Sequence, residues 1–324
     1  MHKWLLPDAI DDLLPDEAIV VERLRRVLLD HFGGAGYRLV RPPLVEHLES
    51  LLTGSGRDLE LQTFKVVDPL SGRLLGVRAD ITPQVARIDA HLLNEPGPTR
   101  LCYAGSVLRT AADGPGATRE VMQVGAELFG VAGIEADREV LNLLASALAA
   151  AGVVRVHLDL GHVGIYRALA AGAGLSGDGE SEEIFDALRL KDRPAVTELT
   201  ARLPRAWGNA LAALTTLYGP STEILPAARR VLPDIPAIAN ALAALDDLAA
   251  SAAQYVDALH VDLGDVRGYH YHNGVIFSAY ASGSPVAVGN GGRYDGIGRA
   301  FGRARPATGF TLYLRQLTDL VAGA

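Results

Sequence analysis

The chain has 324 residues, and 38 acidic against 30 basic side chains give it a formal net charge of −8. Hydrophobic residues at 49% and charged residues at 21% exclude a disordered chain, and the acidic balance argues against non-specific binding to nucleic acid or to an anionic membrane. Cys102 is the single cysteine, which excludes an intrachain disulfide and a cysteine-based zinc cluster. The length fits about two domains, or one large domain with an insertion.

In the first 160 residues, helical and strand patterns are mixed. Apolar residues at helical spacing predict a helix over residues 16–32, and Gly33 supplies a stop signal. Thr82 followed by Pro83 is typical of an N-cap and a first helical turn, so a second helix is expected to end near Asn94. A third helix is expected over residues 137–151. Strands are predicted over residues 36–45, 62–67, 73–81, 100–109, 120–130 and 154–160, with a turn at 68–72.

The middle of the chain has a different composition. Residues 164–254 are rich in alanine and helical in pattern, and prolines such as Pro226 are expected to end helices there. Strand patterns return over residues 258–288, including 269–281 and 285–288, and a last helix is predicted over 310–321. Strands on both sides of a helical block favour an α+β fold with a mostly antiparallel sheet. We therefore expect a split domain, 1–163 and 255–324, interrupted by a helical insertion at 164–254.

No segment is typical of a membrane span or a secretory signal. The longest apolar stretch, Val140 to Val154, contains Asn142 and Ser146 and is shorter than the roughly 20 residues that a bilayer requires. The first residues, Met1 to Asp8, are too short in apolar length for a signal peptide. We expect a cytoplasmic protein that binds no membrane.

Common nucleotide and metal motifs are absent. The run Gly289 to Tyr294 has a tyrosine where a dinucleotide fingerprint needs its third glycine, and no P-loop occurs. His270 and His272 share one face of a predicted strand, but no third metal ligand lies near them in sequence. We therefore expect no metal, no cofactor and none of the common hydrolase or dehydrogenase activities.

Polar residues recur at strand spacing. Gln123, Gly125 and Glu127 are two apart, so they face the same way, and Gly125 is expected to leave open space between two polar groups. Arg78, Asp80 and Thr82 share a parity, as do Tyr103, Gly105, Val107 and Arg109. One interpretation is that these polar positions form the solvent-facing side of an antiparallel sheet whose other side is buried. The other is a pocket whose acids, amide, hydroxyl and arginines suit a zwitterion such as an amino acid.

These residues resemble a known family. Four ordered motifs are similar to those of the class II histidyl-tRNA synthetase catalytic domain: Arg78 to Pro83, Arg119 to Glu127, Val266 to Tyr271, and Gly291 to Gly296. The resemblance covers most of the chain, including a dimer-interface segment that ends near Pro43.

This resemblance implies a histidine site. The matching positions that would hold the ammonium and the imidazole are Asp80, Thr82, Gln123 and Glu127. Arg267 and Arg109 match positions that serve the carboxylate and the ATP phosphate, and Tyr294 would close the imidazole pocket together with Tyr271 and His272. Thr82 could instead be only the helix cap already described.

The departures from the synthetase pattern concern ATP. Ala111 replaces a glutamate, Gln316 stands where an arginine grips ATP, Tyr313 replaces a glycine, and His272 replaces a second tyrosine. One lost charge-assisted contact costs about 1.5–3 kcal/mol. We expect no adenylation because these contacts are lost, and no tRNA binding because no anticodon-binding domain follows the last helix.

A synthetase-like core with these departures resembles the regulatory subunits of ATP phosphoribosyltransferase. The resemblance implies a non-catalytic homodimer within a hetero-oligomer, a short-form catalytic subunit as partner, and free histidine as feedback effector in the first step of histidine biosynthesis. The alternative is a truncated histidyl-tRNA synthetase-like ligase that still forms histidyl-adenylate.

Overall fold

The computed structural model describes residues 5–54, 57–114, 117–175, 178–266, 268 and 271–321. The chain divides into two units, each of which joins segments distant in sequence. The first unit is Met1–Ala132, Ser146–Val153 and Asp295–Ala324, and the second is Gly133–Ala145 and Val154–Tyr294.

The first unit contains a sheet with the strand order β1-β5-β6-β12. The strands are β1 (Arg38–Leu39), β5 (Thr99–Leu108), β6 (Glu120–Phe129) and β12 (Ala307–Tyr313). β5 pairs with β6 and β6 with β12 in antiparallel fashion, whereas β1 runs parallel to β5. Only Arg38 and Leu39 of the strand predicted over residues 36–45 join the ladder, because Pro42 and Pro43 interrupt the extended segment.

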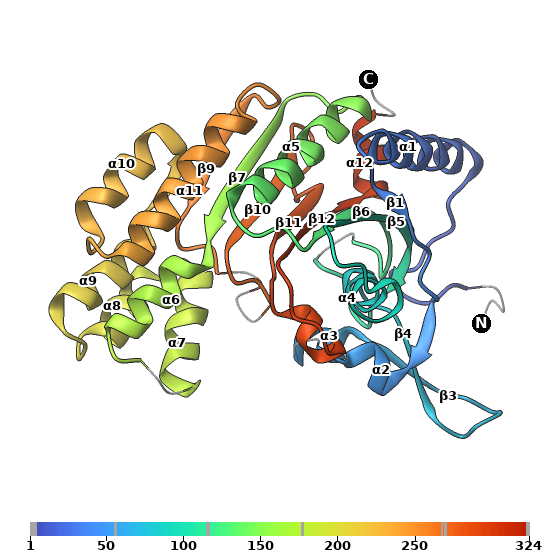
Figure 1. The fold of residues 1–324 in the computed structure, drawn as a ribbon, viewed down its shortest axis with the longest axis horizontal. Helices are drawn as coiled ribbons and strands as arrows, with labels where there is room; N and C mark the ends of the chain where they lie inside the picture. The colour runs from blue at the N-terminus through green and yellow to red at the C-terminus, as the bar shows by residue number, and fades with distance from the viewer. Residues whose placement is uncertain are drawn as a thin grey trace. The chain divides into compact units, whose positions relative to one another are not determined.

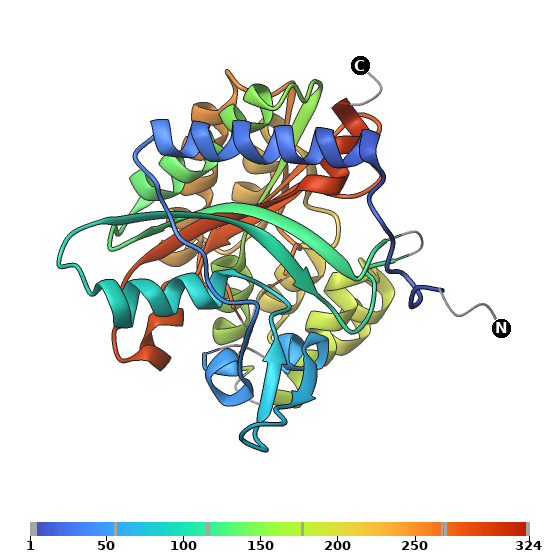
Figure 2. The same cartoon turned by 90° about the vertical axis from the view of Figure 1, so that its right-hand side faces the viewer.

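One face of this sheet is covered by α1 (Pro15–Gly34), which packs against β5 and against α12 (Leu314–Val321) (Figure 2). Its buried positions, Val21, Leu24, Leu28 and Phe32, recur at helical spacing, which confirms the predicted helix. The ring of Phe32 meets the edge of Phe310 on β12, with 5.5 Å between the centroids. The apolar stripe of α1 therefore fixes this helix on the sheet.

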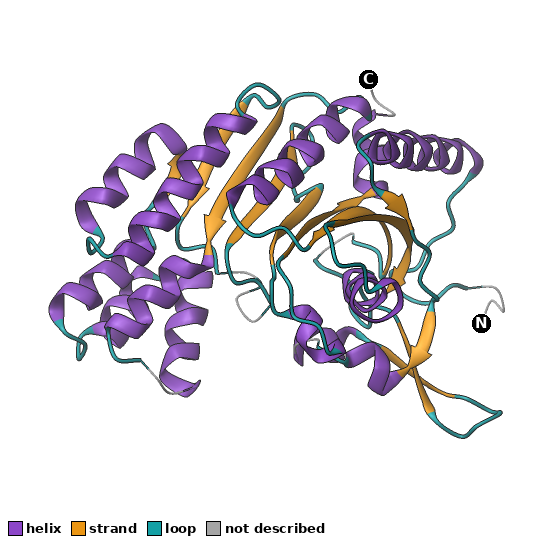
Figure 3. Cartoon of the chain, in the orientation of Figure 1, coloured by secondary structure: helices purple, strands orange, loops and turns teal. Residues whose placement is uncertain are grey.

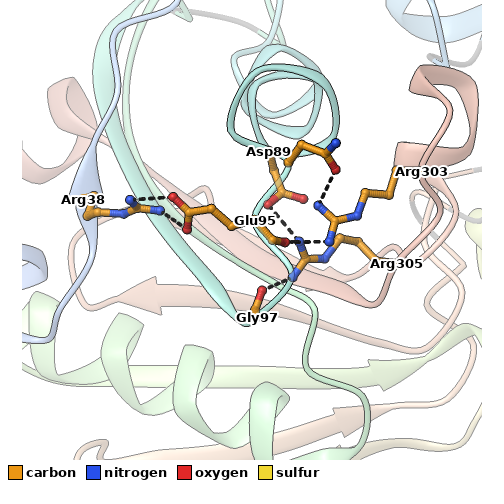
Figure 4. Close-up of polar contacts among 7 residues, drawn as sticks. Arg38, Asp89, Glu95, Gly97, Arg303 and Arg305 are labelled. Atoms are coloured by element: carbon orange, nitrogen blue, oxygen red, sulfur yellow. Dashed lines mark hydrogen bonds and ion pairs between the residues drawn. The ribbon is translucent and has the colours of Figure 1, made fainter.

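A second helical segment follows the candidate site residues. It begins as α4 (Thr82–Arg87), continues as a π-helix (Ile88–Leu93) and ends at Asn94, whose left-handed conformation stops it as predicted. Its far end is tied down by polar contacts (Figure 4). The buried Asp89 pairs with Arg305 at 3.3 Å, and Arg303 donates to Asn94 at 3.0 Å. These bonds connect the end of the helical segment to the residues that lead into β12.

A small antiparallel sheet with the order β2-β4-β3 completes this unit. Its strands are β2 (Val45–His47), β4 (Leu74–Val77) and β3 (Phe64–Val67), and three short helices accompany it, α2 (Leu48–Leu52), α3 (Arg57–Gln62) and the 3-10 helix Ile297–Phe301. The β3–β4 hairpin projects with little helical cover (Figure 3), and Leu70 at its tip is 95% exposed. The predicted hairpin is confirmed.

The second unit contains strands in the order β11-β10-β7-β9-β8. They are β7 (Val156–His162), β8 (Tyr218–Pro220), β9 (Ala258–Asp262), β10 (Val275–Ala281) and β11 (Gly289–Arg293). β10 pairs antiparallel with β11 and β7, and β7 pairs parallel with β9. Helix α5 (Ile134–Ala150) begins in this unit and ends in the first.

The remaining helices of this unit follow β7 (Figure 1): α6 (Val163–Gly172), α7 (Asp178–Arg189), α8 (Arg193–Thr200), α9 (Arg205–Ala213), α10 (Ser221–Val231) and α11 (Pro236–Ala252). α11 packs on β7 and β10 through an apolar stripe that includes Leu242, Leu245 and Leu248. Among the helices of the described residues, none has the length and apolar character needed to cross a bilayer.

The α+β class with a mostly antiparallel sheet is confirmed, but three local predictions are wrong. Residues 285–288 are not a strand; the glycine cluster Gly289–Arg293 forms β11 instead, because its backbone pairs with β10 regardless of side-chain propensity. Residues 310–313 belong to β12, so the last helix begins only at Leu314. Pro226 lies inside α10 and does not end it.

Candidate functional site

Three strands of the first unit present facing residues in register. On β6, Gln123, Gly125 and Glu127 point to one face of the sheet. Their partners on β5 are Gly105, Tyr103 and Leu101, and their partners on β12 are Tyr313, Thr311 and Gly309. Gln123 is 2% exposed and Glu127 is 1% exposed, so the interpretation as a solvent-facing sheet surface is wrong. These nine positions form the polar grid.

The glycines of the polar grid are covered by neighbouring side chains. A Cβ on Gly125 would lie 2.5 Å from the hydroxyl oxygen of Tyr103, and a Cβ on Gly309 would collide with the carboxylate of Glu127. The expectation that Gly125 leaves open space is therefore wrong. Its missing side chain makes room for the ring of Tyr103, which crosses β6 from β5.

The hydroxyl of Tyr103 joins a buried group of polar atoms. It donates to Glu127 Oε1 at 3.2 Å and lies 2.7 Å from the hydroxyl of Thr311. Thr82 donates to the same oxygen of Glu127 at 3.0 Å. Burial, reinforced by the carboxylates of Glu127 and Asp80, raises the pKa of Tyr103 well above its usual value. Tyr103 thus remains a hydrogen-bond donor at neutral pH.

Thr82 is held by this group and does not cap a helix. It is the first residue of α4, Ile81 occupies the N-cap position, and no side chain caps the helix. The cap interpretation is therefore wrong, because the Thr82 hydroxyl is turned towards Glu127.

Asp80 and Gln123 form the neighbouring pair. Gln123 Nε2 donates to Asp80 Oδ1 at 2.9 Å, and the backbone N–H of Ile81 is shared between Asp80 Oδ1 at 2.9 Å and Gln123 Oε1 at 3.2 Å. These bonds fix both side chains next to Thr82. The structure therefore brings Asp80, Thr82, Gln123 and Glu127 together on one face of the first unit.

Arg109 follows the end of β5. Its Nη1 donates to Asp113 Oδ2 at 2.6 Å, and its Nε points to the carbonyl oxygen of Ala79 at 3.5 Å. Since Ala79 precedes Asp80, the guanidinium lies near the Asp80–Gln123 pair. Arg109 is thus placed with the other site residues of this unit.

The predicted aromatic residues lie in the second unit. Tyr271 and Tyr294 stack with 5.0 Å between ring centroids, and the rings of Tyr271 and His272 are nearly perpendicular, also with 5.0 Å between centroids. Burial lowers the pKa of His272 to about 4, so its ring is neutral at pH 7. Its Nδ1 lies 3.3 Å from the carbonyl oxygen of Arg293. Arg267, the remaining predicted residue, lies outside the described residues.

Arg293 positions the start of this aromatic group. Its Nε donates to both carboxylate oxygens of Asp137, at 3.1 and 3.0 Å, and its Nη2 donates to the carbonyl of Gly133 at 2.8 Å. Both charged side chains are almost completely buried. The ion pair anchors the end of β11, which Tyr294 directly follows.

Sequence reasoning missed several supporting residues. Tyr103 shares the parity of Gly105, but nothing along the chain shows that its ring crosses Gly125. Thr311 was assigned to a helix, and the Arg293–Asp137 pair joins positions 156 residues apart. No signal along the chain marks Thr311, because its strand and its burial appear only in the structure.

Carboxylates, hydroxyls and an amide next to an arginine suit a small zwitterion, since the acids attract an ammonium and the guanidinium a carboxylate. Within the described part of the chain, no group of three or more His, Cys, Asp or Glu could hold a metal ion.

Comparison with known proteins identifies the family. The family model described as histidyl-tRNA synthetase matches residues 9–317. A protein from Ralstonia nicotianae named ATP phosphoribosyltransferase regulatory subunit is 56% identical over 321 residues, 99% of this chain and 82% of that protein. A protein of the same name from Thiobacillus denitrificans is 56% identical over 326 residues, with 100% and 99% covered. The chain belongs to the histidyl-tRNA synthetase-like family of ATP phosphoribosyltransferase regulatory subunits.

Solved structures of this family agree with the assignment. The Bacillus halodurans structure described as an ATP phosphoribosyltransferase regulatory subunit/histidyl-tRNA synthetase has a TM-score of 0.88 at 27% identity, and the match covers 99% of this chain and 84% of that one. The histidyl-tRNA synthetase of a Nostoc species shares the fold, with a TM-score of 0.76 at 15% identity over 100% of this chain and 75% of that one. The resemblance predicted from the four motifs is confirmed, and the regulatory-subunit relatives indicate a regulatory, non-catalytic role.

Proposed function

We propose that this chain is the non-catalytic regulatory subunit of an ATP phosphoribosyltransferase, and that it binds free histidine and transmits feedback inhibition to a short-form catalytic subunit. The observation that carries the proposal is the buried group of Thr82, Tyr103 and Glu127 beside the Asp80–Gln123 pair. Buried polar side chains that are fixed in this way form a preorganised site for a polar ligand.

The parts of histidine would be shared among these residues. Asp80 and Gln123 suit the ammonium, Arg109 suits the carboxylate, and Glu127 suits an imidazole N–H. By resemblance, Arg267 would also serve the carboxylate, and Tyr271, His272 and Tyr294 would contact the imidazole.

Adenylation is disfavoured by the residues near the end of β12. Tyr313, where the synthetase pattern has glycine, stands opposite Gln123 in the polar grid. Gln316, where that pattern has its ATP arginine, lies in the first turn of α12. Arg315 is one residue away from that position and so does not present its guanidinium on the same face; its Nη1 lies 3.8 Å from Asp11 Oδ2. These features support a chain that binds the amino acid without activating it.

The assembly that we propose is a homodimer within a hetero-oligomer. The dimer would form through the N-terminal segment that ends near Pro43, and the catalytic subunit would be the second component. The proposal includes no tRNA. A coupling free energy of about 1–3 kcal/mol between the histidine site and the catalytic subunit would change activity about 5- to 150-fold.

Reconstitution tests the proposal. The chain is mixed with a short-form ATP phosphoribosyltransferase, and product is measured with and without L-histidine. Glu127→Gln should weaken inhibition by histidine, because a neutral amide accepts a hydrogen bond from the ligand more weakly than the carboxylate and puts a donor in place of one oxygen. Glu120→Gln is the matched control, since Glu120 is an exposed residue of the same strand and should leave inhibition unchanged.

Two results would overturn the proposal. One is equal inhibition of the wild type and Glu127→Gln by histidine. The other is histidine-dependent exchange of pyrophosphate into ATP by the isolated chain, which would favour the alternative of a ligase that forms histidyl-adenylate.

A further inference from the structure

Asp113 forms an ion pair with the guanidinium of Arg109. Its Oδ2 lies 2.6 Å from Arg109 Nη1, a short charge-assisted hydrogen bond between residues four apart. The two partners differ in their surroundings, because the side chain of Arg109 is 14% exposed and that of Asp113 is 75% exposed. The side chain of Arg109 is therefore largely buried, whereas that of Asp113 reaches it from the solvent-exposed side.

Arg109 makes further hydrogen bonds with the backbone of Ala79 and with Arg119. Its Nε faces the carbonyl oxygen of Ala79 at 3.5 Å, and its own carbonyl accepts from Arg119 Nε at 3.1 Å. The backbone N–H of Arg109 donates to the carbonyl of Arg119 at 2.9 Å. These bonds hold the arginine beside Asp80, while the carboxylate of Asp113 satisfies its charge.

A ligand that places an anionic group on Arg109 must therefore share the guanidinium with Asp113 or displace it. Displacement is cheap, since an ion pair with one well-solvated partner contributes little free energy. Displacing Asp113 nevertheless lowers the affinity for the ligand. Asp113 is only four residues from Arg109 in the chain and therefore competes for the guanidinium at a high effective concentration.

We propose that Asp113 is a built-in competitor for the α-carboxylate of the bound amino acid, and that it lowers the protein's affinity for histidine. The inference rests on the proposed function and deepens it. The anion is assigned as a carboxylate because Arg109 already accommodates one from Asp113, and because the neighbouring Asp80 would attract the ammonium that an amino acid carries on the same carbon.

Titration calorimetry at low ionic strength tests the inference with three proteins and three ligands, which are L-histidine, L-histidinamide and inorganic pyrophosphate. For Asp113→Asn, the dissociation constant of L-histidine should fall about two- to fivefold. L-histidinamide, which lacks the carboxylate, should bind this variant and the wild type equally. Asp247→Asn is the matched control, because Asp247 also pairs with an arginine at the surface, Arg138, and should change neither constant.

The outcomes separate the inference from the proposed function. If the wild type binds histidine and Asp113→Asn binds it no more tightly, the inference is overturned and the proposed function is not. Equal tightening for histidine and histidinamide also overturns it, because the effect would not depend on the carboxylate. Tighter binding of inorganic pyrophosphate without a change for histidine would assign Arg109 to phosphate instead. No binding of histidine by the wild type, alone or with the catalytic subunit, overturns the proposed function itself.

Discussion

The hydroxyls of Tyr103 and Thr311 lie 2.7 Å apart although the residues are separated by 208 positions in sequence. The contact spans β6, because the ring of Tyr103 passes over Gly125 to reach β12. It links the first and last strands of the polar grid through a single side chain. Removing one oxygen atom at this point should therefore affect both Glu127 and Thr311.

Tyr103→Phe should lower the free energy of unfolding by about 1–3 kcal/mol, because it leaves a buried carboxylate and a buried hydroxyl each with one hydrogen bond fewer. Denaturant titration followed by circular dichroism measures the change. Tyr280→Phe is the control, since Tyr280 is only partly buried and should shift stability by less than about 0.5 kcal/mol. Equal stabilities of the two variants would show that the Tyr103 hydroxyl is not a stabilising contact.

Gly125→Ala should destabilise the protein by about 1–3 kcal/mol through overpacking. The added methyl group would lie 2.4 Å from the backbone oxygen of Phe310 and 2.5 Å from the Tyr103 hydroxyl oxygen. Gly97→Ala is the control, because no heavy atom lies within 4 Å of its added Cβ. A thermal melting temperature unchanged by Gly125→Ala, as by Gly97→Ala, would contradict the close packing of Tyr103.

Asp137→Asn should cost about 3–5 kcal/mol of unfolding free energy, because it leaves the buried guanidinium of Arg293 without its counter-charge. The neighbouring residue on α5 supplies the comparison. Arg138 pairs with Asp247 at the surface, so Asp247→Asn should cost less than about 1 kcal/mol. Urea titrations of both variants measure the difference, and similar costs would argue against a buried pair at Arg293.

Stability should fall as the pH drops from about 6.5 to 4, and His162 should be one cause. Burial lowers the pKa of His162 to about 4 from 6.5, so over this interval the unfolded chain binds a proton that the folded chain does not. The neutral buried ring therefore costs no stability above the unfolded pKa of 6.5. As the pH falls towards the folded pKa of about 4, the free energy of unfolding decreases by up to about 3 kcal/mol. Urea titrations at pH 7 and pH 5 measure the effect.

His162→Asn isolates this contribution. The Nδ1 of His162 accepts from Gly164 N–H at 3.1 Å and caps α6, and asparagine also caps helices well but does not titrate. The variant should therefore keep its stability at pH 7 and lose less of it at pH 5 than the wild type does. An unchanged pH dependence would mean that other groups, such as His272, account for all of it.

The face of the sheet that carries the site could be predicted from the sequence, but the contacts on it could not. The two-residue period of Gln123, Gly125 and Glu127 placed them on one side of β6, and the structure agrees. Which residues stand opposite them depends on the register with β5 and β12, which a local pattern does not encode. Only the structure therefore shows that Tyr103 and Thr311 belong to the site.

The elements that sequence reasoning misplaced share a physical cause. Gly289–Arg293 lacks the branched and aromatic side chains that favour strands, yet its backbone pairs with Phe277 and neighbouring residues of β10. Phe310 and Tyr313 fit the apolar period of a helix, but pairing with β6 holds them in β12. In both segments tertiary hydrogen bonding outweighed local propensity.

The covered glycines restrict which substitutions the polar grid can accept. Arg78 lies over Gly105, Tyr103 over Gly125 and Glu127 over Gly309, so each glycine and its covering side chain form a steric pair. At Gly105 a larger residue collides with the side chain of Arg78, whereas at Gly125 and Gly309 it also collides with the backbone oxygens of Phe310 and Ala126. A paired mutation can therefore relieve the clash at Gly105, but the backbone itself requires glycine at positions 125 and 309.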